Sequence, residues 1–108
     1  MSFISAHVLD ALVGSPARGV AVRLESQAGE ALGDAVTDAD GRVSDLGPDR
    51  LEAGNYRVWF ATGDYFAGNG QDTFYPFVAV NFTVATGQAH YHVPLLLSPY
   101  SYTTYRGS

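Results

Sequence analysis

Hydrophobic and polar residues alternate along most of this chain, in short segments separated by turn-forming residues. The segment 19–26 has the clearest pattern, because Val20, Val22 and Leu24 point to one side of an extended chain and the residues between them to the other. A period of two residues is typical of β-strands with one buried face. Strands are predicted over residues 3–10, 19–26, 31–37, 54–61, 77–84, 89–97 and 100–106.

Glycine, proline and aspartate mark the turns between these segments. Asp40-Gly41 is a strong turn signal, because glycine tolerates a positive φ and the aspartate side chain caps its own backbone. One short helix is predicted over residues 62–69, with Thr62 as its N-cap and Asp64 in its first turn.

Seven or eight short strands at regular spacing, with a single helix, predict an all-β fold. The strand count, spacing and period favour a sandwich of two sheets over a closed barrel. The chain has 108 residues and no linker, internal repeat or low-complexity segment. It is therefore predicted to form one domain over residues 1–108.

The composition is poor in charge and rich in aromatic residues. Only 16% of the residues are charged, whereas 46% are hydrophobic, and the chain holds 7 tyrosines and 6 phenylalanines. A fully solvated monomer usually carries more charge than this. The composition therefore predicts that part of the surface is covered by another copy of the chain.

The charge pattern argues against several classes of partner. The net charge is −5 and the 6 basic residues are scattered, whereas phosphate binding requires clustered lysine and arginine. Neither a nucleic acid nor a membrane is therefore predicted as a partner, and no apolar run approaches the roughly 20 residues of a membrane span. The lack of cysteine and of a signal sequence predicts a cytoplasmic location.

The 3 histidines are the first candidates for chemistry. His90 and His92 are two residues apart on a predicted strand, so their side chains project to the same face. His7 lies on the first predicted strand and points away from its apolar face. A neutral imidazole is the natural general base near pH 7. One alternative is that these are ordinary histidines of a polar strand face or of the core, which is the better interpretation for any one of them alone. Another is a metal site, in which the His-X-His pair supplies two ligands and His7 the third.

Arg42 and the final residues offer further polar chemistry. Arg42 follows the Asp40-Gly41 turn, where a guanidinium can bind a carbonyl-rich ligand and stabilise an oxyanion. No Gly-X-Ser-X-Gly sequence is present, so a serine nucleophile is not predicted. A phenol, a guanidinium and a hydroxyl occur within the last four residues, Tyr105, Arg106, Gly107 and Ser108.

Three blocks of sequence together resemble the transthyretin-like family, in its hydrolase branch. They are residues 6–10 (Ala-His-Val-Leu-Asp) with 14–17 (Gly-Ser-Pro-Ala), residues 37–42 (Thr-Asp-Ala-Asp-Gly-Arg), and the last nineteen residues, which end in Tyr-Arg-Gly-Ser. The resemblance covers nearly the whole chain in the right order. Phe77 departs from the family pattern, where an acidic residue is frequent, as does Ser101, where glycine is common.

The resemblance implies a transthyretin-like sandwich of two four-stranded sheets, with a short helix after the fifth strand. It also implies a homotetramer, built as a dimer of dimers, with active sites where the dimers meet. No metal and no cofactor belongs to the implied site.

The activity implied by the resemblance is hydrolysis of 5-hydroxyisourate to 2-oxo-4-hydroxy-4-carboxy-5-ureidoimidazoline, a step of urate breakdown. The implied catalytic residues are His7, Arg42 and His92, with His92 as the base that activates water and Arg42 beside the oxyanion. The same family also suggests an alternative, a non-catalytic carrier of small aromatic ligands. The implied substrate-binding residues are His7, Arg42, Tyr105, Arg106, Gly107 and Ser108.

Overall fold

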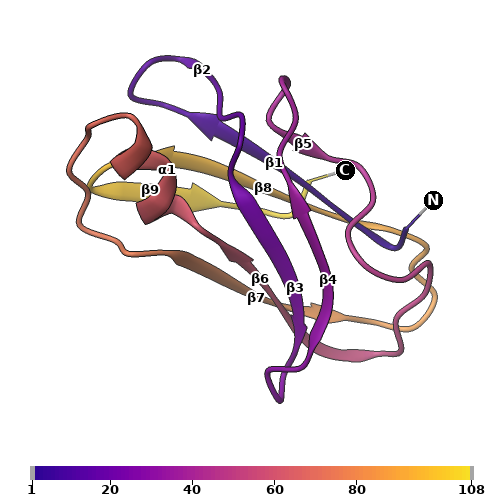
Figure 1. Cartoon of the computed structure of the whole chain (residues 1–108). Helices are drawn as coiled ribbons and strands as arrows, with labels where there is room; N and C mark the ends of the chain where they lie inside the picture. The colour runs from indigo at the N-terminus through magenta and orange to yellow at the C-terminus, as the bar shows by residue number, and fades with distance from the viewer. Residues whose placement is uncertain (1, 108) are drawn as a thin grey trace.

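The computed structural model describes residues 2–107, and its strands form two sheets that pack face to face (Figure 1). One sheet has the strand order β2-β1-β8-β9, with β5 paired to part of β1, and the other has the order β4-β3-β6-β7. The elements are β1 (Ile4–Asp10), β2 (Ser15–Pro16), β3 (Ala21–Ser26), β4 (Ala31–Val36), β5 (Arg42–Val43), β6 (Gly54–Phe60), α1 (Thr62–Gly68), β7 (Val78–Val84), β8 (Tyr91–Ser98) and β9 (Ser101–Thr104).

This architecture confirms the two-sheet sandwich with one helix. The alternation that predicted β3 is reflected in its burial, because Val22 and Leu24 are buried while Ala21 and Arg23 are exposed. The first sheet differs in one detail from two equal sheets of four, since the short strand β5 pairs with β1 and adds a fifth member. Strands β2 and β5 have two residues each, too few to produce an alternating pattern.

The hydrophobic core lies between the two sheets. Each fully buried Val, Leu, Ile or Phe side chain contributes roughly 1.5–3 kcal/mol to the stability of the fold. Phe66 adds the buried side of α1 to the same core. The largest fully buried side chains come from both sheets, the helix and the loops: Ile4, Val8, Val20, Val22, Leu24, Leu46, Val58, Phe60, Phe66, Val78, Leu95 and Leu97.

Helix α1 begins differently from the prediction. Its N-cap is Ala61, which supplies no side-chain cap, so the prediction of Thr62 as the N-cap is wrong. The Thr62 side chain is instead fully buried, and its hydroxyl has no hydrogen-bond partner within residues 2–107. The Ala61 amide donates to the Ala21 carbonyl (2.9 Å), so the chain passes from sheet pairing directly into the helix. Asp64 lies in the first turn, as predicted.

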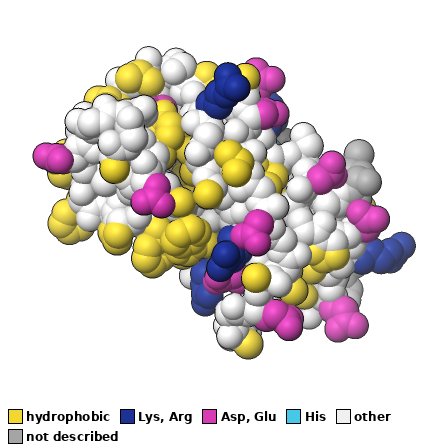
Figure 2. Space-filling model, viewed as in Figure 1, with side chains coloured by type: hydrophobic (Ala, Val, Ile, Leu, Met, Phe, Trp, Pro, Cys, Tyr) yellow, Lys and Arg dark blue, Asp and Glu magenta, His cyan; other side chains and the backbone are white. Residues whose placement is uncertain are grey.

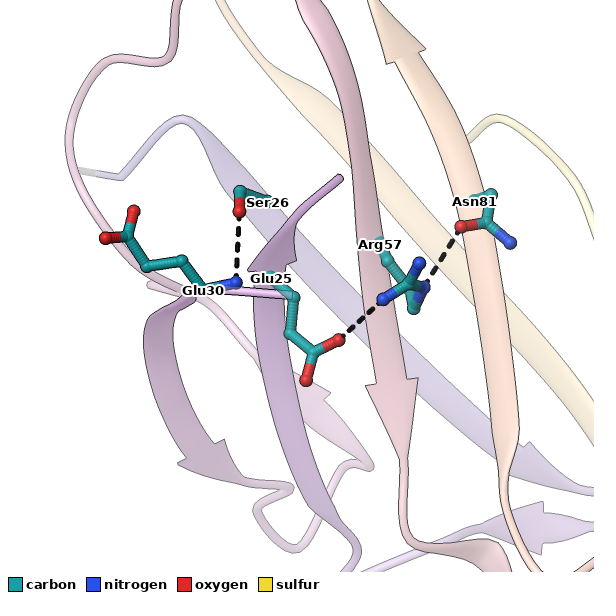
Figure 3. A network of polar contacts seen from close by, with 5 residues as sticks. All are labelled: Glu25, Ser26, Glu30, Arg57 and Asn81. Atoms are coloured by element: carbon teal, nitrogen blue, oxygen red, sulfur yellow. Dashed lines mark hydrogen bonds and ion pairs between the residues drawn. The ribbon is translucent and has the colours of Figure 1, made fainter. Parts of the chain in front are cut away.

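Polar side chains cross the outer face of the second sheet (Figure 3). Arg57 on β6 donates to Glu25 on β3 (2.9 Å) and to Asn81 on β7 (3.1 Å), and all three residues lie directly opposite one another in the strand register. Beside them, Ser26 Oγ accepts from the Glu30 amide in the turn between β3 and β4. Cross-strand pairs of this kind contribute roughly 0.2–1 kcal/mol each and help to fix the register.

The C-terminal segment follows β8 beyond the end of β9. Strand β9 pairs with β8 as far as Thr104, and the two segments meet again in the same register at a bridge between His92 and Gly107. Pro94 lies between these points and has no amide hydrogen, so it interrupts the ladder. The strand predicted to reach Arg106 therefore ends at Thr104, and the tail is brought back to His92.

The surface in Figure 2 mixes charged and uncharged side chains without a continuous field of one sign. Hydrophobic side chains gather on this face where β6 and β7 approach α1. Trp59 on β6 and Phe77, which directly precedes β7, pack with ring centroids 5.2 Å apart. The one helix within residues 2–107 is too short and too polar to cross a membrane.

Candidate active site

Three strands of the first sheet bring the predicted site residues together. Strand β1 runs between β5 and β8, so that His7 lies opposite Arg42 on one side and Ser5 lies opposite His92 on the other. The rings of His7 and His92 are 6.4 Å apart between centroids. Residues 7, 42 and 92, distant in sequence, thus occupy one end of one sheet face.

The turn before β5 holds Arg42 in place. The Asp38 carboxylate accepts the backbone N–H groups of Asp40 and Arg42, each at 2.9 Å. The hydrogen bond from the Arg42 amide is the main reason that the pKa of Asp38 is lowered. Gly41 has a φ of +73°, and a Cβ atom there would collide with the Val8 carbonyl oxygen. The Asp-Gly signal therefore corresponds to a turn that only glycine fits.

The same turn also determines which ring nitrogen of neutral His7 carries the hydrogen. Its Nε2 atom lies 2.9 Å from the Asp40 carbonyl oxygen, which can only accept a hydrogen bond. Nε2 therefore carries the hydrogen in this contact, and a neutral His7 ring keeps its lone pair on Nδ1.

His92 has a more enclosed setting at the centre of the cluster. Ser5 Oγ lies 2.7 Å from His92 Nδ1 and 2.9 Å from His90 Nε2, which confirms that the two histidines face the same way. Burial lowers the pKa of His92 below its usual 6.5, and the charges of Arg42, His7 and His90 lower it further. His92 is consequently neutral at pH 7 and able to accept a proton.

The C-terminal tail closes one side of the His92 ring. The Gly107 amide donates to the His92 carbonyl (3.0 Å), and a Cβ atom on Gly107 would lie 2.5 Å from His92 Cδ2. Arg106 turns aside, because its guanidinium carbon stacks 4.6 Å from the Tyr91 ring centroid while an N–H donates to Gln88 (3.0 Å). Ser108, predicted to bind substrate, lies outside the described residues.

Two pockets have His92 in their lining. One has a volume of about 410 Å³, and His92 shares its lining with Arg42, Ser5 and His90. The other, of about 560 Å³, is lined by His92 together with Tyr105 and Arg106, and also reaches β7. Tyr105 is 56% exposed, so its phenol is open to solvent at this pocket. His92 is therefore common to the pocket that Arg42 lines and the pocket that Tyr105 lines.

A metal site needs at least three ligands that converge on one point. His90 and His92 instead converge on the Ser5 hydroxyl. Over the described residues 2–107, no group of three His, Cys, Asp or Glu side chains is arranged to hold a metal ion. His90 Nε2 and His92 Nδ1 are both within hydrogen-bond distance of Ser5 Oγ.

Sequence reasoning missed Ser5 and Asp38 as parts of this cluster. A signal for Ser5 was present, since it lies on the same face of β1 as His7, two residues away. Its contact with His92, however, depends on the parallel pairing of β1 with β8, which joins opposite ends of the chain. Asp38 lies within the sequence block that ends in Arg42, where its role is to cap the turn.

Comparisons with known proteins show which family the chain belongs to. A family model described as the HIUase/Transthyretin family matches residues 4–107. The chain belongs to the HIUase/Transthyretin family. It is 47% identical over 111 residues to the 5-hydroxyisourate hydrolase of Salmonella typhimurium, covering 99% of this chain and 82% of that relative.

Two solved structures represent different proteins of the HIUase/Transthyretin type. The 5-hydroxyisourate hydrolase of Klebsiella pneumoniae matches with a TM-score of 0.91 and 37% identity, over 99% of this chain and 100% of that one. Sea bream transthyretin, solved in complex with thyroxine, matches with a TM-score of 0.88 and 35% identity, over 97% of this chain and 94% of that one. The fold is thus common to a hydrolase and to a transthyretin solved with thyroxine, and side-chain chemistry must distinguish them.

Proposed function

We propose that this protein hydrolyses 5-hydroxyisourate. The observation that carries the proposal is that His92, a half-buried histidine with a lowered pKa, shares a pocket with the Arg42 guanidinium. A base and a cation on one pocket are the two groups that hydrolysis of a carbonyl compound requires. Relatives named 5-hydroxyisourate hydrolase, at 47% identity in Salmonella, supply the identity of the substrate.

The reaction is general-base hydrolysis without a metal or a covalent intermediate. His92 takes a proton from water, and the water oxygen forms a bond to a carbonyl carbon of the substrate ring. Arg42 stabilises the negative charge that develops on the carbonyl oxygen. The tetrahedral intermediate then collapses, the ring C–N bond breaks, and His92 returns the proton to the departing nitrogen. The product is 2-oxo-4-hydroxy-4-carboxy-5-ureidoimidazoline.

The remaining predicted residues bind the substrate around this pair. His7 lies beside both Arg42 and His92, and Gly107 lets the tail approach the His92 ring closely. Tyr105 is exposed at the second pocket, where its hydroxyl is free to bind a carbonyl-rich ring. Arg106 reaches the substrate only after its guanidinium leaves Tyr91 and Gln88. The role of Ser108, and the cytoplasmic location, stay predictions.

The working protein is a homotetramer, with its sites where dimers meet. The exposed aromatic side chains support this assembly, because Phe74, Tyr100 and Tyr105 are each more than half exposed in the single chain. A second copy that covered them would remove a large apolar area from water.

The first test of the activity is an ultraviolet assay in which urate oxidase generates 5-hydroxyisourate in place. Wild-type protein is expected to accelerate the decay of the substrate, with and without a chelator. Loss of activity on chelation would contradict the metal-free mechanism. No acceleration by folded protein would reject the hydrolase and favour the carrier alternative, for which binding of thyroxine is the next measurement.

Substitutions at the two central residues test the assignment of roles. We expect His92→Ala to lower kcat by roughly 10²- to 10⁴-fold, the usual contribution of a positioned base. We expect Arg42→Ala to lower it by about 10²- to 10³-fold, the usual cost of losing an oxyanion donor. Arg23→Ala is the matched control, because Arg23 pairs with Asp34 on the other sheet. Folded His92→Ala or Arg42→Ala with nearly wild-type turnover would overturn the assignment.

A further inference from the structure

A network of hydrogen bonds connects His92 Nδ1 through Ser5 and His90 to the backbone of Ser2. Ser5 Oγ lies 2.7 Å from His92 Nδ1 and 2.9 Å from His90 Nε2. On the far side of the His90 ring, Nδ1 lies 3.3 Å from the carbonyl oxygen of Ser2. A hydroxyl has one hydrogen, so Ser5 can donate to only one of the two rings, and the other ring must donate to Ser5.

The Ser2 carbonyl determines which group donates and which accepts in each of these hydrogen bonds. A carbonyl oxygen only accepts, so the contact at 3.3 Å requires the hydrogen of His90 to be on Nδ1. A neutral His90 then has its lone pair on Nε2 and accepts from the Ser5 hydroxyl. Because that uses the only hydrogen of Ser5, the His92 ring must donate to Ser5 from Nδ1.

Ser2, whose carbonyl oxygen lies at one end of this hydrogen-bond network, is buried and has three further hydrogen bonds. Ser2 is 4% exposed, and its amide donates to the Asp45 carboxylate (2.8 Å). Its hydroxyl donates to the Ile4 carbonyl (2.8 Å) and accepts from the Leu46 amide (2.8 Å). The Ser2 amide and hydroxyl thus hold this residue in place by three hydrogen bonds, and its carbonyl oxygen faces His90 as an acceptor.

We propose that Ser5 and His90 are positioning residues that hold neutral His92 with its hydrogen on Nδ1 and its lone pair on Nε2. Nδ1 faces Ser5, and the Cδ2 edge is covered by Gly107. Within residues 2–107 no group hydrogen-bonds to Nε2, which leaves this nitrogen for water. The inference rests on the proposed function, in which His92 is the base.

The tautomer decides whether His92 can act. A neutral imidazole accepts a proton only at the nitrogen that has a lone pair, and the partner of the other nitrogen sets which one that is. In the opposite tautomer, His92 would present an N–H group to the attacking water and could not deprotonate it. Once Nε2 takes a proton, the bond from Nδ1 to Ser5 remains and orients the resulting imidazolium.

The test that needs no substrate is nuclear magnetic resonance of protein labelled with nitrogen-15 in histidine. Correlation of ring nitrogens with ring hydrogens at pH 8 distinguishes protonated from bare nitrogens, and the chain has only 3 histidines to assign. In wild-type protein, we expect His92 to be protonated at Nδ1 and bare at Nε2. In Ser5→Ala, we expect a substantial population of the opposite tautomer.

Kinetics of matched variants measure the consequence. Partners that orient histidine ligands at metal sites are typically worth about 10- to 100-fold in activity, and we expect Ser5→Ala to lower kcat by a similar factor with little change in KM. Ser5→Thr keeps the hydroxyl and should recover most of the loss. The pair His90→Gln and His90→Asn avoids changing β1. Glutamine can place an acceptor near the position of Nε2, whereas asparagine cannot, so His90→Gln should be the more active.

Several outcomes would overturn the proposal. They are a wild-type His92 protonated at Nε2, a Ser5→Ala protein with unchanged tautomer and kcat, and equal activity of the two His90 variants. If Ser5→Ala fails to fold, the His90 pair and the wild-type spectrum still decide. A wild-type protein with the expected tautomer but no hydrolysis of 5-hydroxyisourate would reject the proposed function while supporting the tautomer assignment.

Discussion

Gly107 is a glycine that is required by space and not by backbone conformation. Its missing side chain leaves room for the His92 ring, since a Cβ atom would lie 2.5 Å from Cδ2 and 3.1 Å from Pro94 Cγ. The backbone bridge to His92 holds the tail at this distance. The sequence shows a glycine near the chain end, but only the packing explains it.

Substitution of Gly107 is therefore expected to reduce activity more than stability. The added methyl group of Gly107→Ala must displace either the tail or the His92 ring, and a displacement of about 1 Å near the reacting groups can cost roughly 10²-fold in rate. The measurements are kcat and the midpoint of thermal unfolding. Gly68→Ala is the control, because its Cβ would meet nothing within 4 Å. Equal kcat values for the two variants would contradict this account.

The protonation of His92 sets the expected pH dependence at the same scale. Burial lowers its pKa below 6.5, and the electrostatic effects of Arg42, His7 and His90 act in the same direction. Only the neutral ring accepts a proton, so kcat/KM is expected to stay level down to pH 6.5 and to fall at lower pH. The profile from pH 4.5 to about 8 measures this, and a midpoint at or above 6.5 would contradict it.

At the scale of elements, a side-chain contact ties the helix to the first sheet. The Tyr65 hydroxyl on α1 donates to Asp10 at the end of β1 (2.7 Å). Asp10 is 3% exposed and also accepts from the amides of Leu12 and Val13. This contact connects the helix that follows β6 to the strand that holds His7, so it belongs to the support of the site.

Removal of that hydroxyl is expected to destabilise the fold. Tyr65→Phe leaves a buried carboxylate with one partner fewer, which typically costs about 1–3 kcal/mol in the free energy of unfolding. Denaturation by urea at pH 7 measures the loss. Tyr100→Phe serves as the control, because Tyr100 is 64% exposed. Two variants of equal stability would show that the Asp10 contact contributes nothing.

The contribution of the Tyr65–Asp10 contact to stability is expected to be lost at high pH. Burial and the bond to Asp10 raise the pKa of Tyr65 from 10.0 to about 12, so the folded state favours the protonated phenol. Its contribution is complete below pH 10 and is lost as the pH rises towards 12. The difference in stability between wild type and Tyr65→Phe should therefore narrow over this range.

At the scale of the whole molecule, each sheet ends in an edge strand, β7 in one and β9 in the other. Strands β7 and β9 are the ends of their sheets, and residues of both line the pocket beside His92. Unpaired strand edges readily join another chain. The exposed tyrosines of β9 and of the segment around it add apolar area there.

Sedimentation is therefore expected to give about four times the 11.5 kDa mass of one chain. A charge on the β9 edge should weaken the assembly, because it cannot be buried without a partner. Tyr102→Lys is expected to shift the protein to smaller species, whereas Gln27→Lys, in the exposed turn after β3, should not. A wild-type monomer at micromolar concentration would refute the tetramer.

The sequence predicted most of the secondary structure because side-chain alternation and turn chemistry are local. It located six long strands to within two residues at each end, and the turn at Asp40-Gly41 appeared where expected. The exceptions involve contacts with distant segments. The Thr62 side chain is buried in the core and therefore does not cap the helix. Pro94, which is far from Arg106 in sequence, ends the pairing of β9 at Thr104.

The sequence by itself thus determined the class of fold, the face on which each histidine lies, and the residues that match the hydrolase branch. It did not determine which strands are neighbours, because pairing depends on contacts between segments far apart along the chain. The parallel pairing of β1 with β8 puts Ser5 against His92, and the pairing of β1 with β5 puts Arg42 against His7. The chemistry of the site therefore resides in residue types that the sequence shows, and its geometry arises only when the two ends of the chain share one sheet.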